Sequence, residues 1–152
     1  MQLELSKKID YALLWRLEVA GVPQRWQWRP RDWRRFQQDE LATVGVYRDG
    51  AELVAALALL RQPPRARGLK CDSVEVLRLI VAPGLRRRGI GRSLLTSLHR
   101  NSAEVKAAVV ATVPEELVDV QQFLQSCGWL AVGMVPSLDD DLGNAIRFRA
   151  GD

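Results

Sequence analysis

One stretch constrains the fold of this chain more than any other, residues 74–100, which read VEVLRLIVAPGLRRRGIGRSLLTSLHR. Its first eight residues are almost wholly apolar and rich in Val, Leu and Ile, which is typical of a short buried strand. Ala82-Pro83-Gly84 ends that strand, because proline and glycine interrupt regular structure. Further on, Ile90, Leu94 and Leu98 recur every four residues, as on the apolar face of a helix. The stretch therefore predicts a strand, a basic glycine turn and a helix.

The turn between this strand and this helix is suited to an anion. Gly89 and Gly91 lack a Cβ atom, so a ligand can approach the backbone closely. The first turn of a helix also offers N–H donors and the positive end of the helix dipole. Full positive charges come from Arg86, Arg87, Arg88 and Arg92. The pattern favours a diphosphate site over a solvated arginine-rich turn.

The common nucleotide motifs do not fit this turn. Gly-Lys-Ser/Thr is absent, and Leu94 stands where G-x-G-x-x-G requires its last glycine. Residues 86–91 (RRRGIG) instead resemble the Arg/Gln-x-x-Gly-x-Gly/Ala motif of the GNAT N-acetyltransferase superfamily. The preceding residues 79–83 (LIVAP) and the later residues 123–129 (FLQSCGW) also resemble family motifs.

Periodicity and turn signals divide the rest of the chain into short elements. An Asp49-Gly50 turn predicts a hairpin, Ser6 is the predicted N-cap of the first helix, and Gly128 is the predicted stop of the last helix. Strands are predicted over 1–5, 42–47, 52–60, 106–113, 129–135 and 145–149, and further helices over 7–20, 32–41 and 115–127.

The predicted element order, β-α-α-β-β-β-α-β-α-β-β, resembles the GNAT core from end to end. The resemblance implies an α/β (α+β) fold with one domain over residues 1–152. Its mixed central sheet of about seven strands would be flanked by about four helices. The sheet would be splayed between its two parallel central strands.

The resemblance also implies acetyl-CoA as the cofactor, lying where the two parallel strands separate. Leu79, Ile80 and Val81 would face its pantetheine arm, and Phe123 would pack near it or serve as plain core. The pyrophosphate would be held by Arg86, Arg87, Arg88, Gly89, Ile90, Gly91, Arg92 and Ser93. No metal is expected, because His99 is the only histidine.

Acetyl transfer to an amine requires a base that takes a proton from the ammonium group. Glu75 is the candidate, because it interrupts an apolar strand, where a carboxylate is costly. The resemblance also places the catalytic glutamate of related histone acetyltransferases at this position. Strand alternation would put Glu75 on one face with Leu77 and Leu79. The alternative is that its carboxylate reaches solvent at the strand start or pairs with an arginine.

The acid that the family commonly uses, a tyrosine four residues before Gly128, is absent, because Leu124 stands there. Three readings remain open: another group protonates the leaving thiolate, the thiolate leaves unaided, or the protein binds acyl-CoA without efficient catalysis. We favour unaided departure, since a free thiol has a pKa of about 8.5. Cys127 could donate a proton, but a buried structural thiol is favoured there.

The acceptor is expected to be an amine of unknown identity, on a small molecule or a protein. Asp139-Asp140-Asp141 would give its site an acidic rim, or form a solvated turn. Trp15, Trp26, Trp28 and Trp33 are expected as core, with one or two rings lining the acceptor pocket.

Composition limits the other partners. No apolar run reaches transmembrane length, and two cysteines favour a reduced, cytoplasmic setting over a disulfide framework. We expect no membrane partner. The net charge of +4 is modest, and the arginine clusters in 29–35 and 61–70 favour solvated faces over a nucleic-acid surface. The protein is expected to be a monomer or a homodimer.

Overall fold

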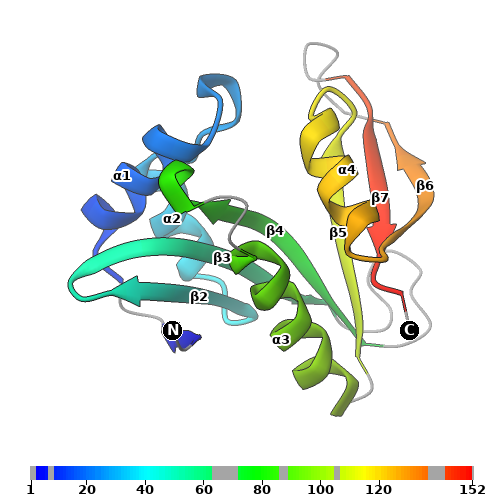
Figure 1. Ribbon diagram of the computed structural model, residues 1–152, viewed down its shortest axis with the longest axis horizontal. Helices are drawn as coiled ribbons and strands as arrows, with labels where there is room; N and C mark the ends of the chain where they lie inside the picture. Colours follow the sequence, from blue (N-terminus) through cyan, green and yellow to red (C-terminus); the bar gives the residue numbers. More distant parts are fainter. Residues whose placement is uncertain are drawn as a thin grey trace. The chain divides into compact units, whose positions relative to one another are not determined.

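The computed structural model describes residues 3–6, 9–62, 72–85, 89–104, 107–136 and 143–151. Seven strands form one sheet in the order β1-β2-β3-β4-β5-β7-β6 (Figure 1). The strands are β1 (Glu4–Ser6), β2 (Ala42–Asp49), β3 (Glu52–Gln62), β4 (Ser73–Val81), β5 (Ala108–Pro114), β6 (Leu130–Val135) and β7 (Ala145–Arg149). The helices are α1 (Tyr11–Gly21), α2 (Pro30–Gln37), α3 (Ile90–Glu104) and α4 (Val118–Ser126), with 3₁₀ turns η1 (Gln24–Trp26) and η3 (Pro83–Leu85). The predicted mixed sheet of seven strands with four helices is confirmed.

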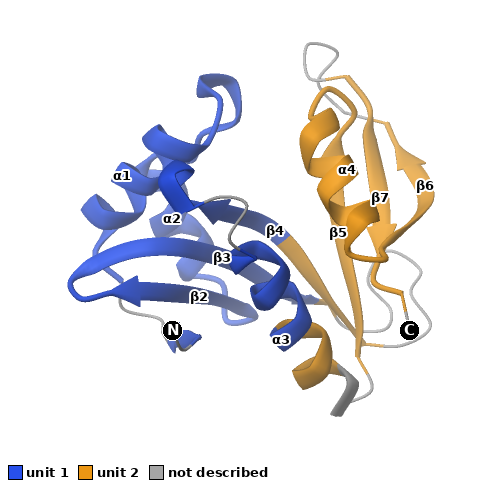
Figure 2. Ribbon diagram, in the orientation of Figure 1, with its two compact units in different colours: residues 1–61, 77–97 blue, residues 62–76, 98–152 orange. Residues whose placement is uncertain are grey.

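The chain divides into two compact units, residues 1–61 with 77–97 and residues 62–76 with 98–152 (Figure 2). The first unit contains β1, α1, α2, β2 and nearly all of β3, together with the second half of β4 and the start of α3. The second contains the first half of β4, the end of α3, and β5, α4, β6 and β7. That all 152 residues act as one domain stays a prediction.

In the first unit, β1, β2 and β3 form an antiparallel ladder. The β2–β3 hairpin closes at the pair Asp49↔Glu52, and Gly50 in its turn has φ of 61°. Glycine adopts this left-handed conformation without the steric cost that a Cβ would add. The turn that the sequence predicted is therefore present, and both strands run two residues further than expected.

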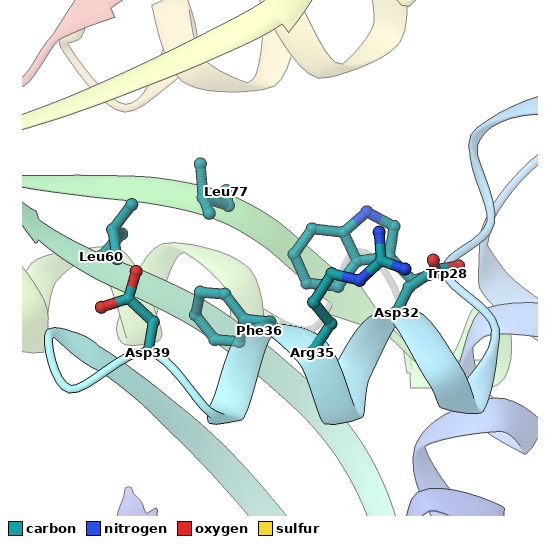
Figure 3. A pocket seen from close by; sticks show the side chains of 7 residues that line it. All are labelled: Trp28, Asp32, Arg35, Phe36, Asp39, Leu60 and Leu77. Carbon is teal, nitrogen blue, oxygen red and sulfur yellow. The ribbon is translucent and has the colours of Figure 1, made fainter.

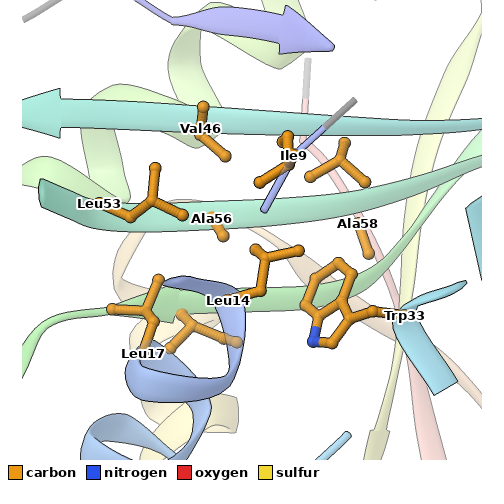
Figure 4. Close-up of a cluster of buried hydrophobic side chains, with 10 residues drawn as sticks. Ile9, Leu14, Leu17, Trp33, Val46, Leu53, Ala56 and Ala58 are labelled. Atoms are coloured by element: carbon orange, nitrogen blue, oxygen red, sulfur yellow. The ribbon is translucent and has the colours of Figure 1, made fainter. Parts of the chain in front are cut away.

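The core of the first unit lies between this ladder and the two N-terminal helices (Figure 4). Leu14 of α1 and Trp33 of α2 are both completely buried. They pack against side chains on one face of β2 and β3, which point toward the helices because strand residues alternate between faces. The buried cluster consists of Ile9, Leu14, Leu17, Trp33, Val44, Val46, Leu53, Ala56, Ala58 and Ile80. Trp33 thus confirms the expected core role of an N-terminal tryptophan.

Helix α1 begins later than predicted. Asp10 is its N-cap, and the Asp10 carboxylate accepts a hydrogen bond of 2.9 Å from the backbone N–H of Ala12. Ser6, the predicted cap, belongs to β1 and pairs with Val44 of β2. The predicted cap was wrong because the β1 ladder takes up Ser6, while Asp10 supplies the oxygen that the first turn needs.

In the second unit, β4 pairs in parallel with β5 and β5 pairs antiparallel with β7. The parallel pairing joins residues 73–76 of β4 to residues 108–111 of β5. A parallel pair requires a long crossover, which α3 supplies. The separation of these two strands beyond Val76, which the family resemblance implies, stays a prediction.

Helix α4 also starts later than predicted, at Val118 rather than Glu115. Glu115 is held by the loop before β7, since its N–H donates to the Asn144 carbonyl over 2.9 Å and its carboxylate accepts from the Asn144 N–H. A turn with a bond from Leu117 N–H to Pro114 oxygen precedes the helix. At the other end Gly128 has φ of 85°, so the predicted glycine stop is confirmed.

Strand β6 is the last strand in the sheet order and pairs on one side with β7. All six of its residues are exposed, and none is charged. The register with β7 shifts between Ala131 and Gly133, so Val132 forms a bulge. Within the described ranges, no helix has both the length and the apolar content that crossing a membrane requires.

Candidate active site

Strand β4 carries the candidate base Glu75 and three of the described candidate cofactor residues, Leu79, Ile80 and Val81. Leu77 packs against the buried cluster under α1 and α2, and its neighbour Arg78 contacts Glu18 of α1. Ile80 also joins that cluster. That Glu75, Leu77 and Leu79 share one face of β4 stays a prediction.

The first unit contains a buried ion pair between Glu18 and Arg78. The Glu18 carboxylate is completely buried, and the Arg78 guanidinium donates to both of its oxygens over 2.8 and 2.7 Å. The Trp33 indole N–H and the Trp28 backbone N–H also donate to it, over 3.1 and 3.2 Å. Arg78 further donates to the Trp26 carbonyl over 2.8 Å. This network attaches the α1–α2 connection to β4.

In the second unit, Glu75 lies in a buried polar group. Its side chain is 2% exposed and accepts hydrogen bonds from Gln62 Nε2 and, over 3.2 Å, from Thr112 Oγ1 of β5. Gln62 and Ser73 are buried too, and the Gln62 Oε1 and Ser73 Oγ atoms have no protein partner. Glu75 is therefore a carboxylate inside the sheet, held by hydrogen-bond donors and lying beside polar atoms that a water molecule can satisfy.

Described residues of the glycine turn lie at the start of α3, in the first unit. Gly89 is exposed with φ of 77°, and a Cβ built there would meet no atom of the described residues within 4 Å. The open space next to its backbone fits the close approach of a ligand. Arg92 and Ser93 are exposed, whereas Ile90 is buried and anchors the helix. The predicted ligands Arg86, Arg87 and Arg88 lie outside the described residues.

Helix α4 contains no phenolic acid. Leu124, at the position of the family's common tyrosine, is 4% exposed. The two tyrosines of the chain are Tyr11 in α1, under the Arg34 guanidinium, and Tyr47, which is buried in β2. Cys127 is a half-buried free thiol at the C-cap of α4. Phe123 is half-buried in α4, and its packing near a cofactor stays a prediction.

A pocket of about 420 Å³ opens in the first unit beside α2 and the strands β3 and β4 (Figure 3). Its lining combines apolar and charged side chains: Trp28, Asp32, Arg35, Phe36, Asp39, Leu60 and Leu77. Trp28 lines this pocket, and the expectation that an N-terminal tryptophan ring lines the acceptor pocket stays a prediction. The acidic segment at residues 139–141, also expected near the acceptor, lies outside the described residues.

Sequence reasoning missed the Glu18–Arg78 pair and the partners of Glu75. Arg78 interrupts the apolar run of β4 just as Glu75 does, so the same signal would have found it. Thr112 is the one residue with a hydroxyl group in the otherwise apolar strand β5, so the same kind of signal applies to it. Among the described residues, no group of three or more His, Cys, Asp or Glu side chains is placed to hold a metal ion.

Comparison with known proteins identifies the family. The model of the acetyltransferase (GNAT) family matches residues 11–129. The fold is similar to the ribosomal-protein-S18-alanine N-acetyltransferase of Escherichia coli, with a TM-score of 0.71 at 17% identity, covering 98% of this chain and 93% of that one.

Two further solved structures are similar. A Bacillus subtilis acetyltransferase in complex with CoA has a TM-score of 0.71 at 15% identity and covers 99% of this chain and 98% of its own. Arabidopsis thaliana NAA60 in complex with acetyl-CoA has a TM-score of 0.73 at 13% identity, with 97% of each chain covered. A comparison with curated proteins found no match. The family match spans most of the chain and the described elements have the GNAT fold, so the protein belongs to the GNAT acetyltransferase family.

Proposed function

We propose that the protein is an acetyl-CoA-dependent N-acetyltransferase that acts on a primary amine. The family match over residues 11–129 is the observation that carries this proposal. Two of the similar structures contain CoA or acetyl-CoA, which supports the same cofactor here. Acetyl-CoA supplies the thioester carbonyl to which the amine nitrogen adds as the carbon–sulfur bond breaks.

The described part of the cofactor site is formed by β4 and the start of α3. The backbone of Leu79, Ile80 and Val81 would align the pantetheine arm, and Phe123 would pack against it. The diphosphate would be bound by Gly89, Ile90, Gly91, Arg92 and Ser93, together with the three arginines 86–88. The exposed Gly89 and the open space around it fit this role.

Glu75 is the proposed base. Its burial and its two hydrogen bonds fix the carboxylate in one position, so water would carry the proton from the ammonium group to it. Gln62 and Thr112 hold Glu75 and are positioning residues. The thiolate leaves without a protein acid, consistent with the buried leucine at position 124.

The cofactor proposal is tested by replacing Gly89 with valine and titrating acetyl-CoA in a calorimeter. A β-branched residue strains the positive φ and fills the open space where the diphosphate would lie, so we expect binding to be lost. Gly50→Val is the matched control, because Gly50 also has positive φ and open surroundings but lies in the β2–β3 turn. If the Gly89→Val variant binds acetyl-CoA as tightly as the wild type, the proposed diphosphate site at Gly89 is wrong.

A second candidate function is an acyl-CoA-binding module with little catalysis, which Leu124 favours because it replaces the usual acid. Release of free CoA thiol over an amine panel distinguishes the two functions. Turnover that falls at least about 100-fold in Glu75→Gln, with acetyl-CoA binding retained, supports the enzyme. Binding without thiol release for every amine supports the module.

A further inference from the structure

We propose that the pocket beside α2 binds the non-reacting part of the acceptor and selects a singly charged amine with an aromatic or branched aliphatic body. This inference rests on the proposed acetyltransferase function. It concerns the first unit alone, where Leu77 of β4 lines the pocket two residues before the segment proposed to align pantetheine. One strand therefore takes part in both sites.

The centre of the pocket is apolar. Phe36, Leu60 and Leu77 line it, together with the Trp28 ring (Figure 3). The pocket has a volume of about 420 Å³ and is open to solvent, so it can cover one side of a small organic molecule. Burying a phenyl or isobutyl group among such side chains raises affinity by about 10-fold or more relative to leaving it in water.

The aromatic wall is fixed before any ligand arrives. The Trp28 ring lies 5.0 Å from the Trp33 ring at 74° and 5.4 Å from the Phe36 ring at 51°. The Arg78 guanidinium lies 4.9 Å from the Trp28 ring centroid, and the Trp28 backbone N–H donates to the Glu18 carboxylate. A wall held from several sides loses little freedom on binding, so its contact area contributes to affinity.

The charges around this apolar centre favour a cation. Asp32 and Asp39 each accept one backbone hydrogen bond of 2.9 Å, from the N–H groups of Arg29 and Leu41, which fixes their orientation. Each carboxylate can accept further bonds from a ligand ammonium. Arg35 offsets one of the two negative charges. One net negative charge beside an apolar floor suits a monocation, whereas a polyamine would place extra charges against leucine and phenylalanine.

The experiment compares acceptors with the same primary amine and different bodies. Wild-type thiol release is measured with 2-phenylethylamine, 3-methylbutylamine, ethylamine and spermidine. We expect kcat/KM for the two amines with larger bodies to exceed that for ethylamine by at least about 10-fold, and spermidine to be no better than ethylamine. A kcat/KM for ethylamine equal to that for the two larger amines, or a higher kcat/KM for spermidine than for ethylamine, would overturn the inference.

Variants assign this preference to the pocket. Phe36→Ala should reduce the ratio of kcat/KM for 2-phenylethylamine to kcat/KM for ethylamine toward one, whereas Phe36→Leu should keep most of that ratio. Asp39→Asn should raise KM for both amines. Val132→Ala, on the exposed face of β6, is the control and should leave every ratio unchanged. A ratio that survives in a folded Phe36→Ala protein would show that the preference arises elsewhere.

A binding measurement separates this inference from the proposed function. Two-dimensional NMR of the uniformly labelled protein, titrated with 2-phenylethylammonium, should shift the Trp28 indole resonance, and Phe36→Ala should reduce that shift. If acetyl-CoA neither binds nor turns over but the shift is present, the acetyltransferase proposal fails and the pocket stands. If acetyl-CoA binds and the Trp28 signal does not move at millimolar amine, the pocket inference fails alone.

Discussion

The buried ion pair between Glu18 and Arg78 gives the sharpest test of the structure. Replacing Arg78 with methionine keeps an apolar stem of similar length but removes the guanidinium. Glu18, which is completely buried, would keep only its bonds from Trp33 and Trp28. Removing one partner of a buried pair typically costs about 3–5 kcal/mol, because the other charge stays unpaired. This loss is a large part of the total stability expected for a domain, about 5–15 kcal/mol.

Urea unfolding followed by circular dichroism measures this loss. With a slope of about 2 kcal/mol per molar urea, the midpoint of Arg78→Met should fall by about 2 M. The exposed pair of Arg48 and Glu4, at 3.1 Å and with side chains 32% and 52% exposed, provides the matched control. Arg48→Met should cost less than about 1 kcal/mol, because solvent screens that pair.

A second background separates the unpaired charge from lost packing. Glu18→Gln removes the negative charge but leaves an oxygen to accept from the tryptophan donors. In that background Arg78→Met should cost at least about 2 kcal/mol less than in the wild type. If Arg78→Met is as mild as Arg48→Met, or costs the same in both backgrounds, the buried pair does not have the role that its geometry indicates.

Three further changes have definite expected outcomes in the same unfolding assay. Trp33→Phe should cost about 1–3 kcal/mol, because Glu18 loses the indole donor, and a neutral result would argue against that bond. Gly128→Ala should cost about 1–2 kcal/mol, since φ of 85° strains a residue with a Cβ although the space is open, and a stabilised variant would contradict this. Leu94→Ala removes a completely buried side chain of α3 and should cost about 2–5 kcal/mol, with a loss below 1 kcal/mol indicating looser packing.

The sequence was sufficient for the element order, because apolar runs or helical spacing mark most elements and glycine or proline marks many of their ends. The ends were less predictable where a side chain had two competing partners. Ser6 could cap a helix or pair with another strand, and it lies in β1 because it pairs with Val44. Glu115 could begin a helix or bind the loop before β7, and its hydrogen bond to Asn144 holds it outside α4.

The site was predictable where one residue type is required and less so where residues meet across the fold. Gly89 could be proposed from its motif, because a missing Cβ is a local property. Neither the Glu18–Arg78 pair nor the Gln62–Glu75 bond has a fixed sequence spacing: their members are 60 and 13 residues apart. In β6 the register with β7 shifts between Ala131 and Gly133, because a bulge adds a residue that a period of two does not anticipate.

The exposed strand β6 has a practical consequence for work with this protein. Leu130 and Met134 are 64% and 61% exposed at the edge of the sheet, on a strand without lysine, internal proline or any charge. Such an edge can pair with an extended segment from another chain, so concentrated samples are prone to aggregation. A lysine in place of Val132 would repel an incoming strand while leaving the interior packing untouched.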